Sequence, residues 1–291
     1  MTAGNKVRAG AALAVAVVAI SWSAILVRLA AAPALAIAFY RMLFSTAALA
    51  PTGLRAAGPA SRRDLGLATL AGVLLGLHFA SWISSLDYTS VASSVMLVTT
   101  QPLFTAVLGP SLLGERVGIR GAFAVILSLA GIGLIAGGDL QIGGQALLGD
   151  GLAIVGALTA SLYFMIGRAL RDRIRFSRYL LLVNGAATVV LLLFVLAYGV
   201  PLRGFPPMAW VWFALLAAGP NLVGHGLLNW SVRRLPAFPV NMAVLGEPVL
   251  ATVYAAVLFG EMPTRWFYPG AALILAGLLM VQWTREEGEA V

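Results

Sequence analysis

The chain of 291 residues contains no cysteine, a single lysine (Lys6) and only two histidines. Without cysteine it can form neither structural disulfide bonds nor thiolate nucleophiles. Charged residues make up only 10% of the chain, whereas hydrophobic residues make up 60% and the mean hydropathy is +0.94. So few polar side chains cannot cover the surface of a soluble globule, and the composition therefore predicts an integral membrane protein.

Apolar windows of the roughly 17 to 25 residues that a helix needs to cross a bilayer recur along the whole chain. The first window follows Lys6 and Arg8, as in a signal peptide, but it is longer than a signal peptide's apolar region. It also carries Arg28 where a cleavage site would lie, so we expect it to remain as the first transmembrane helix. The sequence predicts ten transmembrane helices, at residues 9–29, 33–53, 65–86, 90–112, 119–138, 148–168, 178–199, 208–230, 237–259 and 266–283.

The net charge of +8 is distributed between the apolar windows and forms no continuous patch, which argues against nucleic acid as a partner. If ten helices alternate from a cytoplasmic N-terminus, fifteen of the nineteen basic residues fall in cytoplasmic segments. Three (Arg28, Arg203 and Arg265) fall outside, and Arg41 lies within the second span. Cytoplasmic segments are the basic ones in membrane proteins, so the distribution favours ten helices with both termini cytoplasmic.

Two stretches of the chain share one layout: "TTQPLFTAVLGPSLLGE" (99–115) and "LGEPVLATVYAAVLFGE" (245–261). Their prolines and their closing Gly-Glu pairs match at an offset of 146 residues, and the similarity extends on both sides. The sequence therefore predicts two five-helix repeats, residues 1–141 and 142–291. Because five is odd, the second repeat is inverted, an arrangement typical of secondary transporters with a substrate site near the bilayer midplane.

Both stretches place a polar residue before a proline in the middle of a span, Gln101-Pro102 and Glu247-Pro248. Proline removes a helix N–H and crowds the preceding turn, so we expect bends that serve as hinges at these four residues. A bend exposes backbone groups that only protein or water can satisfy, which points these positions inward. The Gly-Glu pairs predict helix C-termini, with Glu115 and its counterpart in the second stretch as anchors at the membrane surface.

Two charged residues, Arg41 and Glu247, lie near the middle of predicted spans, where a charge costs on the order of 3 kcal/mol on insertion scales. Glu247 occupies a position that holds neutral Gln101 in the first repeat. It is either a carboxylate that couples protons or binds an amine, or a structural acid that accepts hydrogen bonds from the bent helix or pairs with Arg41. Arg41 in turn requires a structural partner or contacts the substrate directly.

Polar and aromatic side chains form helical faces at corresponding places in the two halves, on the third and eighth spans, and a further stripe on the fourth. Aromatic residues also lie near the middle of the first and sixth spans. A central cavity for flat or apolar substrates would use such faces, but hydrogen bonds between helices and plain packing explain them as well. The predicted cavity residues are Trp22, His78, Ser81, Trp82, Met96, Thr99, Thr100, Tyr163, Asn221, His225 and Asn229.

The paired sequences "QPLFTAVLGPSLLGE" and "EPVLATVYAAVLFGE", each followed by a helix rich in small residues, resemble the signature of EamA-type members of the drug/metabolite transporter superfamily. The "FYRMLF" of the second span, where that family often carries an arginine, adds to the resemblance, which covers nearly the whole chain. It implies ten helices, cytoplasmic termini and export of amino acids or other metabolites across the bacterial inner membrane. Within the family, the chain is most similar to YddG-type exporters of aromatic and other apolar amino acids. It departs from the pattern in the two extra prolines of "RRLPAFPVN".

The predicted function is secondary transport by alternating access, exporting aromatic or other apolar amino acids. The alternative is an exporter of other drugs or metabolites, or a lipid-linked flippase of the same fold. One buried arginine and one lysine argue against phosphorylated cargo. The sequence has no nucleophile or metal motif of an enzyme and no Walker motif for ATP. We expect a monomer with no cofactor or metal, whose partners are the substrate and the lipid bilayer.

Overall fold

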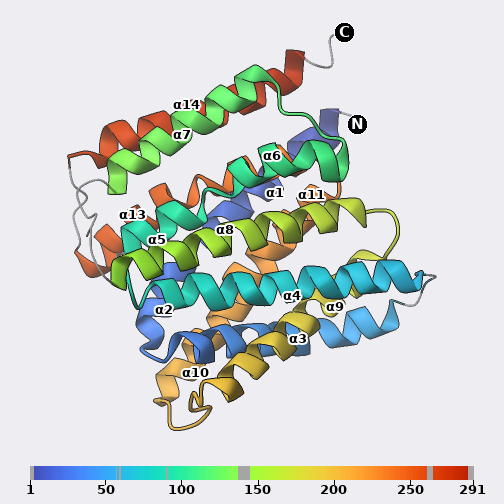
Figure 1. Cartoon of the computed structure of the whole chain (residues 1–291), viewed down its shortest axis with the longest axis vertical. Coiled ribbons are helices and arrows are strands. Elements are labelled where there is room, and N and C mark those ends of the chain that lie inside the picture. Colours follow the sequence, from blue (N-terminus) through green and yellow to red (C-terminus); the bar gives the residue numbers. More distant parts are fainter. Residues whose placement is uncertain are drawn as a thin grey trace.

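The computed structural model describes residues 3–56, 58, 60–89, 91–136, 145–260 and 265–287, and every regular element in these segments is helical. The helices pack side by side, from α14 and α7 at one edge to α3, α9 and α10 at the other, and α1 begins on the side where α14 ends (Figure 1). The elements are α1 (Ala3–Ile20), α2 (Ser23–Ala30), α3 (Ala34–Arg55), α4 (Arg62–Ser85), α5 (Val91–Val98), α6 (Gln101–Leu113), α7 (Ile119–Ala136), α8 (Gln145–Ala169), α9 (Phe176–Ala197), α10 (Pro207–Leu216), the π-helix η1 (Ala217–His225), α11 (Gly226–Val232), α12 (Ala237–Val244), α13 (Glu247–Phe259) and α14 (Phe267–Glu287).

These elements form ten apolar spans. Within the described residues, seven stretches are long and apolar enough to cross a membrane, and two shorter apolar helices lie within α7 and α14. The pair α5 and α6 makes the tenth. Four spans are built from more than one element: α1 with α2, α5 with α6, α10 with η1 and α11, and α12 with α13. The predicted all-helical fold with ten spans is confirmed.

The breaks in the fourth and ninth spans lie where the sequence predicts bends. Helix α5 ends at Val98 and α6 begins at Gln101, and α12 ends at Val244 and α13 begins at Glu247. Each proline thus lies in the first turn of a new helix, where its missing N–H costs no hydrogen bond. Both new helices end at a glycine in the left-handed conformation, with φ of 70° in α6 and 69° in α13. The predicted helix ends at the Gly-Glu pairs are therefore confirmed.

The first and eighth spans are irregular for other reasons. At the turn between α1 and α2, the Ser21 hydroxyl donates to the Val17 carbonyl at 2.7 Å, a bond that competes with the backbone and bends helices. In the eighth span, Pro220 lies inside the π-helix η1. A proline removes one backbone donor, and the wider π turn accommodates it.

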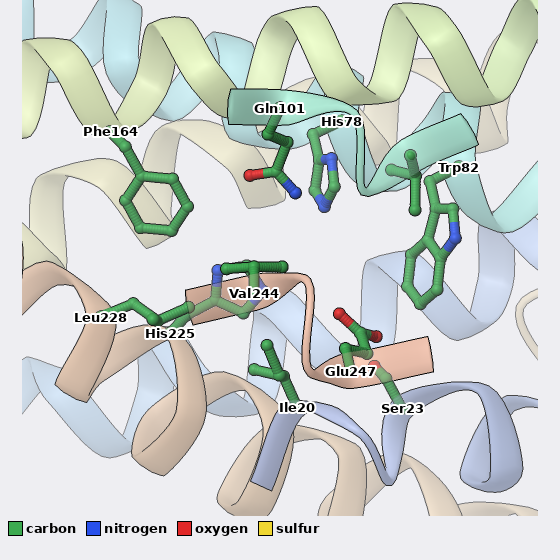
Figure 2. Close-up of a pocket in the computed structure, with 11 residues that line it drawn as sticks. Ile20, Ser23, His78, Trp82, Gln101, Phe164, His225, Leu228, Val244 and Glu247 are labelled. Carbon is green, nitrogen blue, oxygen red and sulfur yellow. The ribbon is translucent and has the colours of Figure 1, made fainter. Parts of the chain in front are cut away.

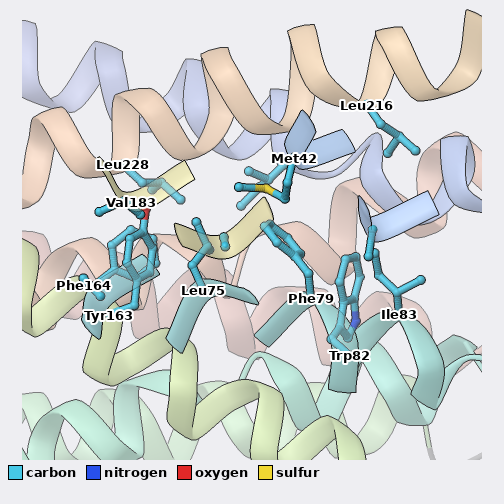
Figure 3. Packing of buried hydrophobic residues seen from close by; sticks show 14 of the residues in the cluster. Met42, Leu75, Phe79, Trp82, Ile83, Tyr163, Phe164, Val183, Leu216 and Leu228 are labelled. Carbon is cyan, nitrogen blue, oxygen red and sulfur yellow. The ribbon is translucent and has the colours of Figure 1, made fainter. Parts of the chain in front are cut away.

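The main hydrophobic cluster joins the first spans to α8, α9 and the eighth span. Figure 3 shows Leu75, Phe79 and Ile83 along one face of α4, with Met42 of α3 nearby. A smaller cluster joins α7, α12 and α14. In a bilayer such contacts stabilise through close packing, because lipid tails are as apolar as the side chains.

The contact between α4 and α9 depends on a glycine. A Cβ atom on Gly72 would lie 2.5 Å from the Val183 carbonyl oxygen and 2.6 Å from the Ala186 Cβ, whereas a Cβ on Gly66 of the same helix would meet nothing within 4 Å. We expect Gly72→Ala to destabilise the fold by about 1–3 kcal/mol, because α4 and α9 must move apart. Thermal unfolding in detergent measures this effect, with Gly66→Ala as the matched control. Equal melting temperatures for the two variants would contradict it.

Candidate functional site

A cavity lies where the broken helices meet (Figure 2). The cavity has a volume of only about 30 Å³, far below the roughly 300–1,000 Å³ of small-molecule sites. The cavity is therefore narrow in this conformation and must widen to admit a substrate. Its walls come from both predicted repeats and consist of Ile20, Ser23, His78, Trp82, Val98, Gln101, Phe164, His225, Leu228, Val244 and Glu247.

Three of these wall residues are the first residues of helices: Ser23 of α2, Gln101 of α6 and Glu247 of α13. The N–H groups in the first turn of a helix have no partner within the helix and carry the positive end of its dipole. The breaks therefore direct three helix N-termini towards the cavity. Transporters with broken helices direct such N-termini at the anionic groups of their substrates.

Glu247 is the acidic side chain of the wall. It is 8% exposed, and its carboxylate points into the cavity, towards Trp82 and His78 (Figure 2). No hydrogen bond or ion pair joins this carboxylate to any other residue that the structure describes. The Arg41 charge attracts this carboxylate from beyond ion-pair distance, but its oxygens have no donor among the described residues, so the arrangement offers a strong site for a group that supplies positive charge or hydrogen-bond donors.

Arg41 lies behind the wall and is fully buried. One of its terminal nitrogens donates to the Ser23 hydroxyl at 2.8 Å, and its guanidinium lies 4.1 Å from the centre of the Phe79 ring. Both Arg41 and Glu247 belong to the described part of the chain, and no ion pair joins them. The structural partner expected for Arg41 is thus a serine, and the structure adds an aromatic ring that the sequence analysis did not anticipate.

Two histidines and a tryptophan give the cavity an aromatic wall. The carbonyl oxygen of Gly156 lies 2.9 Å from His78 Nδ1, so this nitrogen carries the hydrogen, and the His78 ring stacks on Trp82 with centroids 6.0 Å apart. His225 lies against Phe79 and Phe164, at 5.3 and 6.1 Å between ring centroids. His78, Trp82 and His225 belong to the predicted cavity residues, and the structure brings them together in the cavity wall.

Three other predicted cavity residues bond to their own helices. The Ser81 hydroxyl donates to the Leu77 carbonyl at 2.8 Å, and the hydroxyls of Thr99 and Thr100 donate to the carbonyls of Val95 and Leu97. None of the three lines the cavity in the described part of the chain. Serine and threonine satisfy themselves in this way on apolar helices, so their presence on a face does not require a cavity.

Tyr163, Asn221 and Asn229 hold helices together. The Asn221 amide donates to Asn184 of α9 at 2.8 Å, and the Asn229 amide donates to the Tyr163 hydroxyl. All three are buried, and they lie behind the cavity wall rather than on it. The packing explanation therefore describes these residues better than the cavity explanation.

Trp22 lies away from the cavity. It is 36% exposed and stacks on Tyr254 of α13, with ring centroids 4.7 Å apart. The turn between α1 and α2 directs Ser23 to the cavity in its place. The side chain of Met96 is outside the part of the chain that the structure describes.

The sequence does not single out six of the wall residues. Five are apolar side chains that nothing in a hydrophobic chain distinguishes, and the sixth is Ser23. Its neighbours in "ISWSA" mark a polar interruption of the first span, which was a usable signal. The six are Ile20, Ser23, Val98, Phe164, Leu228 and Val244.

One end of the bundle is held by a group of contacts that we call the Glu115 clasp, formed by Glu115, Arg168 and Ala237. The Glu115 carboxylate accepts from Arg168 Nε at 2.7 Å and from the Ala237 backbone N–H at 2.8 Å. The clasp thus ties the end of α6 to α8 and to the start of α12, on the side where α1 begins and α14 ends (Figure 1). Glu261, the counterpart of Glu115 in the second stretch, lies outside the described residues.

A bundle of apolar spans, with broken helices that meet at a cavity, is typical of membrane transporters. The chain matches the EamA-like transporter family over residues 8–137 and again over residues 147–283. It belongs to this family and is a multi-pass membrane transporter. The double match implies two repeats, which are inverted because each has five spans. The predicted boundary between residues 141 and 142 falls outside the described residues.

Relatives support the same assignment. An uncharacterized transporter of Archaeoglobus fulgidus is 27% identical over 270 residues, which cover 93% of this chain and 94% of that protein. The uncharacterized transporter YoaV of Bacillus subtilis is 24% identical over 229 residues, 74% of this chain and 75% of that protein. A solved crystal structure shares the fold, with a TM-score of 0.78 and 19% identity over 97% of this chain and 99% of that one. Neither relative's name states a substrate.

Proposed function

We propose that the protein exports amino acids with aromatic or other apolar side chains, by alternating access to the central cavity. The observation that carries the proposal is the Glu247 carboxylate, which is buried, points into the cavity and makes no hydrogen bond or ion pair within the described residues. An ammonium group offers it both a positive charge and three donors. A proton would also neutralise the carboxylate, and the variant Glu247→Gln separates the two roles, as argued in the Discussion.

The rest of the cavity suits an apolar side chain. Phe164 and Leu228 lie at the end opposite Glu247 and Ser23 (Figure 2), and Val244 lines the wall as well. No lysine or arginine lines this cavity in the described part of the chain, which argues against phosphorylated cargo. The cavity therefore has a polar end for a head group and an apolar end for a side chain.

A cavity that admits so little water must open to one side and then to the other. The Glu115 clasp joins parts of both predicted repeats on the side where we expect the cytoplasm. Rocking of the repeats about the bends at Gln101-Pro102 and Glu247-Pro248 would break the clasp and open that side.

Transport into proteoliposomes tests the proposal. We expect the purified protein to move labelled phenylalanine, tryptophan or leucine faster than labelled glutamate or a sugar phosphate, with or without a pH gradient. A lipid flippase would instead move a fluorescent lipid between leaflets. Failure of every amino acid in the panel, measured beside protein-free liposomes, would refute the proposal.

The prolines at the bends provide a further prediction. Replacing Pro102 or Pro248 with Ala restores a backbone donor and lets the helix continue through the bend. We expect the transport rate to fall about 10-fold, equivalent to a barrier increase of about 1.4 kcal/mol, with a smaller loss of expression. Pro110→Ala, within α6 and away from the break, is the matched control. Unchanged rates in both bend variants would remove the hinge role.

A further inference from the structure

We propose that Ser23, backed by Arg41, binds the carboxylate of the substrate, so that the cavity recognises a whole zwitterionic head group. This inference rests on the proposed function, in which Glu247 binds the ammonium. It adds a second subsite, at Ser23, which binds an anionic group. The contact between Glu247 and the ammonium does not require this residue.

The hydrogen bond between Arg41 and Ser23 determines what the serine can do. Arginine has only donors, so the Ser23 oxygen accepts at 2.8 Å and its own hydrogen must point elsewhere. Ser23 is 2% exposed and lines the cavity, and no other hydrogen bond of its hydroxyl occurs within the described residues. The hydroxyl is therefore free to donate to an acceptor in the cavity.

The surroundings of Ser23 favour an anionic acceptor. Ser23 is the first residue of α2, so the positive end of this helix dipole faces the same point. Arg41 lies directly behind it, and its guanidinium attracts the Glu247 carboxylate without forming an ion pair with any carboxylate of the described residues. A hydroxyl polarised by a guanidinium at a helix N-terminus is a strong donor to a carboxylate.

The geometry also fits one head group. An amino acid carries its ammonium and its carboxylate on the same carbon, so the two subsites must be neighbours. Ser23 and Glu247 lie at the same end of the cavity (Figure 2), and α2 packs against α13. Arg41 and Glu247 are thus two buried opposite charges that do not pair directly, and a zwitterion between them satisfies both.

The inference predicts a change in specificity rather than a general loss. In Ser23→Ala, we expect the half-saturating concentration of phenylalanine to rise about 10-fold, since each 1.4 kcal/mol of binding is a factor of ten. Inhibition by phenylethylamine, which lacks the carboxylate, should not change. Ser23→Thr retains the hydroxyl and should restore phenylalanine binding.

The experiment is counterflow of labelled phenylalanine in proteoliposomes, with unlabelled phenylalanine or phenylethylamine as competitor. Ser128→Ala is the matched control, because Ser128 is a fully buried serine on α7, outside the cavity wall. Selective weakening of phenylalanine in Ser23→Ala supports the inference. Equal weakening of both competitors, or of neither, overturns it and leaves the amine role of Glu247 standing. Absence of phenylalanine transport in the unaltered protein overturns the proposed function and the inference together.

Discussion

Glu247→Gln is expected to reduce amino-acid transport by about 100-fold, because removing one partner of a buried charged contact costs 2–5 kcal/mol or more, and 1.4 kcal/mol is a factor of ten. The carboxylate is 8% exposed, and no other acidic residue among the described residues lines the cavity, so no neighbouring carboxylate can replace it. Folding should survive, since glutamine has the same shape and the carboxylate makes no hydrogen bond or ion pair within the described residues. An unchanged or higher melting temperature of the purified variant checks this point.

Two assays of the same variant distinguish amine binding from proton coupling. Uptake driven by a pH gradient requires both amine binding and proton coupling. Counterflow at uniform pH requires only substrate binding and translocation. If Glu247 binds the ammonium, Glu247→Gln loses both activities and Glu247→Asp, which retains the charge, recovers part of each. Counterflow at the normal rate in Glu247→Gln, with gradient-driven uptake abolished, would instead assign the residue to proton coupling.

Glu115→Ala is expected to shift the equilibrium between the closed state and the state open on the clasp side about 10-fold towards the open state. The variant removes two hydrogen bonds of a charged group, and the lowest net value for one such bond, about 1.5 kcal/mol, already corresponds to a factor of ten. Leu228→Cys in the cavity wall reports the opening, because the chain has no other cysteine. The rate at which an impermeant maleimide labels this cysteine from the clasp side measures accessibility.

A second ion pair provides the control for this prediction. Arg171 and Asp172 are bonded at 3.0 Å, but their side chains are 42% and 85% exposed. Exposed pairs contribute little, so Asp172→Asn should leave the labelling rate unchanged. Equal labelling in Glu115→Ala and Asp172→Asn would show that the clasp does not hold the cavity closed.

Much of the fold could be predicted because a bilayer imposes a simple rule on composition. Each span must be apolar for its full length, so the spans stand out from the sequence. The internal similarity then places the breaks at Pro102 and Pro248, since proline interrupts the backbone regardless of tertiary context. The break after Ile20 has no proline, and depends on a serine whose hydroxyl bonds to the backbone only once the helix is formed.

The site was harder to predict than the fold. A charge such as Glu247 is conspicuous in an apolar span, because its cost demands a reason. Uncharged polar residues are ambiguous: His225 reaches the cavity, whereas Asn229 on the next turn bonds to Tyr163. The same helical face serves both purposes, and only the positions of neighbouring helices decide between them. Apolar wall residues such as Phe164 carry no sequence signal at all.

The central claim is that the cavity beside Glu247 is the substrate site, and a crystal structure with para-iodophenylalanine tests it most directly. The anomalous signal of iodine locates the side chain of the bound compound without ambiguity. We predict an iodine peak at the apolar end of the cavity, near Phe164 and Leu228, with the ammonium at Glu247. An iodine peak on the lipid-facing surface of the helices, with the cavity unchanged, would contradict the claim.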